Sequence, residues 1–336
     1  MLALVARGGK AHIDRARPEP EARAGESRIA VRLAGVCATD LEILRGYMGF
    51  EGIPGHEFVG IAIDGPLAGK RVVGEINAAC RQCERCARGL DRHCAHRTVL
   101  GILGRDGAFA QMLRLPSCNL LEVPKAVSDE AAVFVEPLAA AFAILEQVPI
   151  LRGTRVAVLG DGRLGILCTW ALAASGARVT AMGRHRMKLD LAGKPVPDAF
   201  PTERILLRDI STERALDGGT ILERCGGPFP VVVDATGSPL GLKSALELVE
   251  PRGTIVLKTT TREAPPESLA RIVIDEIRVV GSRCGRFAPA LDALARGQLD
   301  PTGLIHGRLP LEQGVEALDR AGQPGTLKVL LEMPRT

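Results

Sequence analysis

This chain of 336 residues lacks two things most clearly: aromatic residues and an excess of one charge. Phe, Tyr and Trp make up 3% of it, and 43 Lys and Arg stand against 39 Asp and Glu, for a net charge of +4. A nucleic-acid-binding module needs a basic stripe with interleaved aromatic side chains. The composition therefore excludes a nucleic-acid partner, including a zinc-ribbon module that clustered cysteines would otherwise suggest.

A long apolar run and a secretion signal are also missing. The start, MLALVARGGK, is apolar only up to Arg7 and has no cleavage-site pattern, so it predicts a first strand. The run AAVFVEPLAAAFAIL (131–145) is broken by Glu136 and Pro137, which indicates a buried helix rather than a membrane span. We therefore expect no membrane partner and a cytoplasmic, reducing location, where an odd count of nine cysteines serves metal or redox chemistry.

Length and pattern predict two domains. Residues 1–145 contain short alternating runs between Gly, Pro and Asp turns, which is typical of a compact antiparallel β domain. From 146 to 285, six apolar runs alternate with helical patterns, which predicts an α/β fold with a doubly wound parallel sheet. The six runs are 155–160, 177–183, 204–208, 231–237, 254–260 and 276–282. Residues 286–336 are expected to fold back onto the first domain.

Four cysteines lie on one short stretch with the spacing C-x2-C-x2-C-x7-C. They are Cys80, Cys83, Cys86 and Cys94. Four thiolates close a tetrahedron around Zn²⁺ and leave no position for water, so the spacing predicts a structural zinc that stabilises the fold. His93 and His96 can compete as ligands, but four correctly spaced cysteines make them unnecessary.

A second candidate set consists of Cys37, His56 and Glu136, from separate segments of the loop-rich domain. A thiolate, an imidazole and a carboxylate suit a catalytic zinc that keeps its fourth position open. Each residue also has a purely structural interpretation. Cys37 can be a small core residue, His56 a hydrogen-bonded structural side chain, and Glu136 a first-turn helix acid before Pro137.

The segment VAVLGDGRLG follows an apolar strand and opens a helix, and it has the pattern G-x-G-x-x-G. Gly160 allows a tight turn, Gly162 lets the backbone approach a pyrophosphate, and Gly165 lets the helix pack on the sheet. Arg163 and Leu164 complete the motif, where the helix N-terminus receives the phosphates. The segment predicts a dinucleotide site.

The next strand ends in Gly183-Arg184-His185-Arg186, where an NAD site would have an acid that binds the ribose. No acid follows before Asp190. A missing carboxylate removes the repulsion of a 2′-phosphate, and Arg184 can pair with that group. The sequence thus favours NADP, although a solvated basic face that accepts NAD through weaker contacts is the alternative.

In order, GVCATDLE, GHEFVG, the four-cysteine loop, VEPLA, GDGRLG and LKVLL resemble the zinc-containing medium-chain alcohol dehydrogenases over essentially the whole chain. The form is similar to the polyol and threonine dehydrogenase side and to an uncharacterised zinc alcohol dehydrogenase-like branch. The resemblance implies a GroES-like catalytic domain (1–145 with 286–336) and a Rossmann domain (146–285). It also implies two zinc ions per chain and a homo-oligomer, a dimer or tetramer.

The resemblance also assigns roles at the second set. Cys37, His56 and Glu136 correspond to the ligands of the catalytic zinc. Glu57 corresponds to a neighbouring carboxylate that approaches the zinc when water leaves, and Asp40 to the acceptor that orients His56.

Three further positions are compared with relatives. Thr39 corresponds to the hydroxyl that takes the alcohol proton. Three residues after this hydroxyl, many relatives have a His that ends the proton relay, whereas this chain has Glu42. Either Glu42 or solvent ends the relay here, or the pocket binds a different substrate. Alternatively, Glu42 is an exposed charge on a helix. Lys328, in LKVLL, matches a basic position that relatives use at the cofactor phosphates, and its alternative is a surface lysine.

These features together predict a zinc-dependent oxidoreductase that transfers a hydride between an alcohol or carbonyl substrate and NADP, with NAD as the alternative cofactor. The competing prediction is an inactive homologue that still binds zinc and dinucleotide. The substrate stays open. Tyr47, Met48 and Phe50 are assigned to an apolar pocket wall, an interface or the core, and Arg283 to a substrate contact or to hinge packing.

Overall fold

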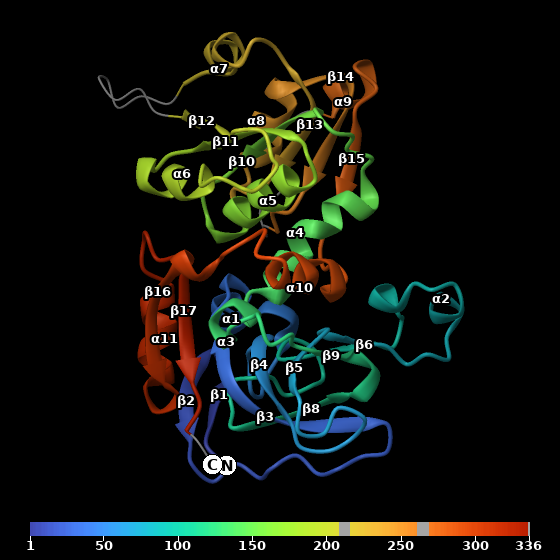
Figure 1. Cartoon of the computed structure of the whole chain (residues 1–336), viewed down its shortest axis with the longest axis vertical. Coiled ribbons are helices and arrows are strands. Elements are labelled where there is room, and N and C mark those ends of the chain that lie inside the picture. The colour runs from blue at the N-terminus through green and yellow to red at the C-terminus, as the bar shows by residue number, and fades with distance from the viewer. Residues whose placement is uncertain (208–215, 261–268, 335–336) are drawn as a thin grey trace. The chain divides into compact units, whose positions relative to one another are not determined.

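The computed structural model describes residues 1–207, 216–260 and 269–334. The chain forms two compact units, one of Met1–Glu136 with Phe287–Thr336 and one of Pro137–Arg286. Their boundary falls inside helix α4 (Val135–Gln147), which is labelled in Figure 1. None of the helices in these described ranges is long and apolar enough to cross a membrane.

The first unit is built on a seven-stranded sheet that joins strands from both ends of the chain. Its order is β16-β17-β3-β4-β5-β9, and β8 pairs with β3. The strands are β3 (Glu26–Gly35), β4 (Glu57–Ala62), β5 (Arg71–Gly74), β8 (Met112–Pro116), β9 (Leu120–Glu122), β16 (Ile305–Pro310) and β17 (Lys328–Glu332). Because β17 is antiparallel to β3, the last strand of the chain is part of the same sheet as residues from its beginning.

The alternation of side chains on β3 shows how this sheet forms its core. Ile29, Val31 and Leu33 are buried, while residues between them are more exposed. This is the period of two expected for a strand with one buried face.

The other elements of the first unit surround this sheet. Two strand pairs are β1 (Ala3–Arg7) with β2 (Lys10–Asp14), and β6 (Asn77–Ala78) with β7 (Thr98–Val99). The helices are α1 (Ala38–Leu44), α2 (Glu84–Ala87), α3 (Asp129–Ala132), α10 (Phe287–Ala295) and α11 (Gly314–Ala321), and the short 3₁₀ helices are η1 (Tyr47–Gly49), η2 (Asp91–His93), η3 (Ser117–Asn119), η4 (Thr302–Leu304) and η5 (Leu311–Gln313). The connection from β6 to β7 carries α2 and η2 and is the cyan loop in Figure 1.

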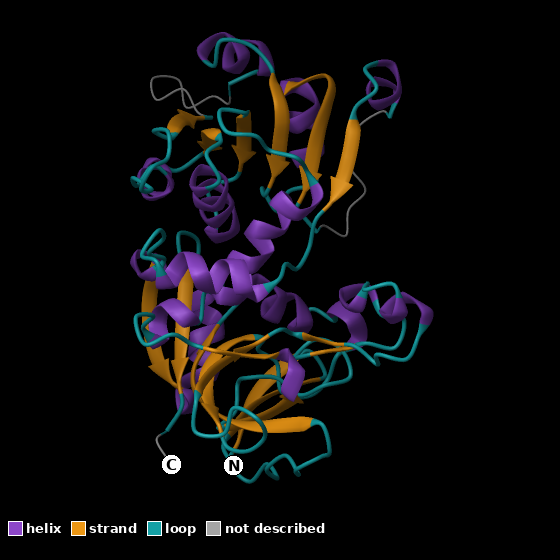
Figure 2. Cartoon of the chain, turned by 45° about the vertical axis from the view of Figure 1, so that its right-hand side comes forward, coloured by secondary structure: helices purple, strands orange, loops and turns teal. Residues whose placement is uncertain are grey.

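The second unit is a six-stranded parallel sheet, which confirms the predicted α/β fold. Its order is β12-β11-β10-β13-β14-β15, and Figure 2 shows the strands in orange with helices against them. The elements are β10 (Arg155–Leu159), α5 (Arg163–Ala174), β11 (Arg178–Gly183), α6 (Arg186–Ala192), β12 (Glu203–Leu206), α7 (Gly218–Arg224), β13 (Phe229–Asp234), α8 (Gly241–Leu248), β14 (Val249–Leu257), α9 (Ala270–Ile274) and β15 (Arg278–Gly281). The strand predicted at 204–208 is β12, and residue 208 lies outside the described residues.

The strand order reverses between β10 and β13. Helix α5 packs on β10 and β11, and α8 packs on β13 and β14. Since parallel crossovers are right-handed, the reversal places these helices on opposite faces of the sheet. Ligands of such sheets bind at the carboxyl ends of the strands beside this switch point, which is where the glycine loop follows β10.

The single Trp belongs to the core of the second unit. Trp170 is 3% exposed, and its Nε1 donates hydrogen bonds to the carbonyls of Leu191 and Ala192, both at 3.2 Å. These bonds tie α5 to the end of α6.

Candidate functional site

The four cysteines of the β6–β7 loop converge on one point. The Sγ–Sγ distances are 3.5 Å for Cys83–Cys86, 3.7 Å for Cys83–Cys94 and 3.4 Å for Cys94–Cys80, and all four sulfur atoms lie within 4.8 Å of one another. A zinc–sulfur distance of about 2.3 Å gives a tetrahedron with edges of about 3.8 Å. The group therefore fits a four-coordinate zinc. In the part of the chain that the structure describes, this group includes neither His93 nor His96.

Backbone groups of this loop favour thiolates. The N–H groups of Cys80 and His96 both donate to the buried Cys94 sulfur at 3.3 Å. Backbone hydrogen bonds from Cys86 and Ala95 lower the pKa of Cys83 to about 6, while burial and the neighbouring thiols raise the pKa of Cys86 to about 12. Four adjacent thiols cannot all ionise without a cation between them, so a divalent ion suits the group.

A second group lies where α1 and β4 begin. Ligand atoms of Cys37, His56 and Glu57 lie within 4.8 Å of one another. His56 is 3% exposed and Glu57 is 0% exposed, while Cys37 is half-buried. A thiol, an imidazole and a carboxylate in a mostly dry site can hold a zinc ion and leave a fourth position open.

Asp40 connects the segments that carry this group. It is fully buried, and its Oδ2 accepts the N–H of Cys37 at 2.7 Å, the capping-box bond that starts helix α1. Its Oδ1 accepts the N–H of Gly55 at 3.1 Å and lies 3.4 Å from His56 Nδ1. Burial alone would lower the pKa of His56, but the charge of Asp40 and hydrogen bonds to Asp40 and Cys37 raise that pKa well above its usual value. Since Nδ1 faces Asp40, Nε2 is the nitrogen favoured for a metal.

The carboxylate of Glu57 is held by Lys328 from strand β17. Lys328 is 1% exposed, and its Nζ donates to Glu57 Oε2 and to the Val36 carbonyl at 3.3 Å. Burial lowers the pKa of Lys328 to about 8, although the charges of Cys37 and Asp40 oppose that shift. Lys328 belongs to the first unit, whereas the glycine loop belongs to the second. Because Lys328 is buried, the alternative prediction of a surface lysine at this position is wrong.

Glu136 lies at the start of α4, where it is half-buried. Among the described residues, the group within 4.8 Å contains Glu57 and does not contain Glu136. Glu136 as the third ligand thus stays a prediction that rests on the resemblance.

The two predicted relay residues are placed differently. The hydroxyl of Thr39 lies 3.8 Å from the sulfur of Cys37. The side chain of Glu42 is 39% exposed and accepts a hydrogen bond from Arg45 Nη1 at 2.6 Å. This contact favours the interpretation of Glu42 as a helix surface charge.

The glycine loop has the shape of a phosphate cradle. Gly160 has φ 112°, and a Cβ there would collide with the carbonyl of Ala235. A Cβ on Gly165 would collide with the Gly160 carbonyl, whereas one on Gly162 would meet nothing within 4 Å. The backbone at Gly162 is thus open to an approaching pyrophosphate at the start of α5, whose first residues are Arg163 and Leu164.

Lys258 organises the end of β15 in the second unit. Its ammonium donates to the carbonyls of Ala140 at 2.6 Å and Arg283 at 2.9 Å, and to Ser282 Oγ at 3.2 Å. These bonds support a packing role for the Arg283 segment, and no sequence motif points to the lysine that makes them.

Met48 and Phe50 line a groove of about 840 Å³ in the first unit. Charged side chains, among them Arg17, Arg23 and Asp106, line the same groove. Tyr47 is 36% exposed and Met48 50% exposed, so neither is a core residue. The wall that Met48 and Phe50 form is mixed in polarity rather than apolar.

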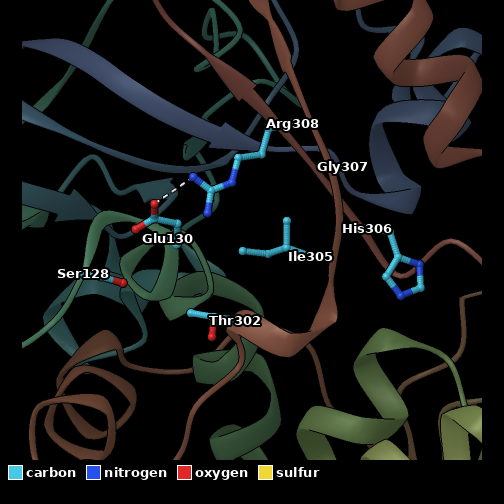
Figure 3. A pocket seen from close by; sticks show the side chains of 7 residues that line it. All are labelled: Ser128, Glu130, Thr302, Ile305, His306, Gly307 and Arg308. Carbon is cyan, nitrogen blue, oxygen red and sulfur yellow. Dashed lines mark hydrogen bonds and ion pairs between the residues drawn. The ribbon is translucent and has the colours of Figure 1, made fainter.

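Another pocket of the first unit, about 570 Å³ in volume, is shown in Figure 3. It is lined by Ser128, Glu130, Thr302, Ile305, His306, Gly307 and Arg308. Arg308 Nη1 and Glu130 Oε1 form an ion pair of 2.9 Å across it, drawn as a dashed line in Figure 3. None of the residues predicted for metal, cofactor or catalysis lines this pocket.

Two family models match the chain. Residues 23–125 match the alcohol dehydrogenase GroES-like domain, and residues 164–296 match the zinc-binding dehydrogenase model. These matches confirm the predicted pairing of a GroES-like domain with a Rossmann-type domain.

Similar proteins have related descriptions. The chain is 32% identical to a probable alcohol dehydrogenase of Mycobacterium tuberculosis, over 85% of this chain and 82% of that one. It also resembles the solved structure of the Escherichia coli CFT073 short chain alcohol dehydrogenase RspB in complex with NADH, with a TM-score of 0.87, 26% identity and 99% coverage of each chain. A zinc-binding dehydrogenase of Sinorhizobium meliloti 1021, solved with NADP, has a TM-score of 0.84 and 26% identity, with 98% coverage of each chain.

Proposed function

The chain belongs to the family of zinc-binding alcohol dehydrogenases, and we propose that it transfers a hydride between an alcohol or carbonyl compound and a nicotinamide cofactor, with NADP preferred over NAD. The observation that carries this proposal is the group of Cys37, His56 and Glu57 with its supporting residues. Two zinc ions per chain, one at this group and one at the four cysteines, are part of the proposal.

Each residue of the group has a distinct task in this proposal. A zinc ion bound there supplies a Lewis acid that lowers the pKa of an alcohol oxygen or polarises a carbonyl. Cys37 and His56 hold the ion, and Asp40 orients the imidazole through its position 3.4 Å from Nδ1. The Thr39 hydroxyl, near the Cys37 sulfur, accepts the proton of the alcohol and passes its own proton on through the cofactor ribose to solvent.

Two carboxylates have different roles. We assign Glu136 as the third resident ligand, on the basis of the family resemblance. Glu57 is bonded to Lys328 and serves as the carboxylate that approaches the ion when water leaves. Glu136→Gln should then reduce zinc bound per chain, whereas Glu57→Gln should retain both ions.

The cofactor is assigned to the second unit. The cradle of Gly160, Gly162 and Gly165 fits a pyrophosphate at the start of α5. The exposed Arg184 after β11 supports NADP, because a guanidinium pairs well with a phosphate. A phosphate contact of Lys328 stays a prediction beside its bond to Glu57.

The experiment that tests the proposal is a titration of the full chain with NADPH and with NADH, followed by nicotinamide fluorescence, together with zinc analysis. Tight binding of NADPH, two zinc ions per chain and oxidation of alcohols from a panel of primary, secondary and polyhydric alcohols would support it. Binding of neither cofactor would contradict it. Binding of cofactor and zinc without turnover would favour the inactive homologue.

We also propose a homo-oligomer and a cytoplasmic location. Strand β15 ends the sheet of the second unit, and its Val279 is 40% exposed. Val273 and Ile274, on helix α9 just before this strand, are 76% and 77% exposed. An edge strand with exposed apolar side chains on it and on the preceding helix suits pairing with a second copy. The odd count of nine cysteines, five of them assigned to zinc, fits a reducing compartment.

A further inference from the structure

A carboxylate lies after strand β11, although the sequence of that segment contains none. Asp161, from the glycine loop, is 9% exposed and reaches across to residues 184 and 185. Its Oδ2 accepts the backbone N–H of Arg184 at 2.7 Å and of His185 at 2.6 Å. The ring Nδ1 of His185 lies 3.0 Å from Oδ2 and 3.2 Å from Oδ1.

This contact requires glycine at the end of β11. A Cβ on Gly183 would lie 2.5 Å from Asp161 Oδ2, which is closer than a Cβ approaches any non-bonded heavy atom in real structures. A side chain at position 183 and the Asp161 carboxylate therefore exclude each other. The fold usually places the acid that reads the adenosine ribose near the end of this second strand. Here the glycine loop places a carboxylate there instead.

We propose that Asp161 determines cofactor specificity, by accepting a hydrogen bond from the 2′-hydroxyl of the NAD(H) ribose and by opposing the 2′-phosphate of NADP(H). Oδ1 keeps acceptor capacity, because the two backbone N–H groups bond to Oδ2 and a carboxylate oxygen can accept a second hydrogen bond beside the His185 Nδ1 contact. A 2′-phosphate would find these N–H donors occupied and a negative charge beside it.

Arg184 and Asp161 thus act in opposite directions on the same loop. The exposed Arg184 favours NADP(H), and its attraction is screened by water and salt. The largely buried carboxylate of Asp161 opposes this attraction without outweighing it. Asp161 thus narrows the preference for NADP(H) and lets the chain also accept NAD(H), a deeper specification that rests on the proposed function.

The test compares dissociation constants for NADH and NADPH, measured by fluorescence titration of the full chain. Asp161→Asn keeps the shape and removes the charge. It should raise the affinity for NADPH relative to NADH by at least about tenfold. The matched control is Asp190→Asn on α6, whose carboxylate is 55% exposed and pairs with Arg204 at 2.8 Å. That control should leave the ratio unchanged.

A second measurement uses the unmodified protein, in case Asp161→Asn does not fold. The 2′-deoxyadenosine analogue of NADH should bind at least about tenfold more weakly than NADH, because it lacks the hydroxyl that Asp161 would accept. An unchanged ratio in Asp161→Asn, or equal binding of the deoxy analogue, would overturn the role of Asp161 while leaving the proposed function in place. Failure of the unmodified chain to bind either cofactor would instead overturn the proposed function.

Discussion

The two candidate metal-binding groups of the first unit, the four cysteines and the set of Cys37, His56 and Glu57, are positioned in different ways. The four cysteines lie on one loop whose helices are short, α2 with 4 residues and η2 with 3, and only Cys94 among them is buried. The second group takes Cys37 from the start of α1 and His56 and Glu57 from the start of β4, and it is supported by the buried side chains of Asp40 and Lys328.

This difference predicts what an ion contributes at each place. A loop with so little buried surface has few interactions that fix its shape, so a metal bound by four thiolates supplies folding free energy. The second group is positioned by a sheet and by buried hydrogen bonds, so its shape does not depend on the ion. A preformed site of this kind can leave one position open for substrate. The first ion should therefore govern stability and the second should govern activity.

Cys37→Ala should have the largest effect of any single change. Turnover should fall by at least about 10⁴-fold, because the polarising ion is lost with its thiolate ligand. Zinc analysis should show loss of the ion at the second group and retention of the ion at the four cysteines. The melting temperature should stay within a few degrees. Cys118→Ala, at an exposed cysteine outside both groups, is the control and should change nothing. Turnover that survives in Cys37→Ala would refute the assignment.

Cys94→Ser should show the opposite pattern. Its sulfur is buried and accepts two backbone N–H groups, so its loss should release the ion of the loop and destabilise the first unit by more than about 4 kcal/mol. Urea unfolding followed by circular dichroism measures this, with Cys118→Ser as the matched control. If stability is unchanged while the ion is lost, the loop does not depend on its metal.

Both groups were predicted from the sequence, but only one of them from spacing. The four cysteines and the glycine loop are continuous stretches, so their spacing reports their geometry directly. The bond between Glu57 and Lys328 joins residues 271 positions apart, and it exists because β17 and β4 both pair with β3. No local pattern reports such a pairing. Here the family resemblance singled out both residues without indicating that they touch.

Asp161 could not be predicted as a ribose contact for a different reason. It stands inside the glycine motif, whose spacing predicts a phosphate site, whereas the fold leads one to expect a ribose-binding acid at the end of β11. The sequence does contain the signal, because Asp161 fills the space that a side chain at Gly183, the last residue of the next strand, would need. Such complementarity is recognised only when the two segments are seen together.

Lys328→Met should test whether the second group is preformed by its buried ion pair. Removing the lysine leaves Glu57 buried without this cation and should destabilise the first unit by about 3 kcal/mol. The double variant Glu57→Gln with Lys328→Met should lose less than the sum of the single losses, by at least about 1 kcal/mol. Urea unfolding of the four proteins gives this coupling, and strictly additive losses would show that the pair contributes nothing to the group.

Glu42→Gln should have the smallest effect, and it separates the second group from the helix surface beside it. Because Glu42 is 39% exposed and bonds to Arg45, we expect turnover to change by less than about twofold and stability by less than about 0.5 kcal/mol. Thr39→Val is the comparison variant and should reduce turnover by about 10²-fold, since the hydroxyl near Cys37 is lost. The pH profile of turnover distinguishes the two roles. If Glu42→Gln lowers turnover more than about tenfold and alters that profile, Glu42 takes part in the proton relay and the active group extends to the surface of α1.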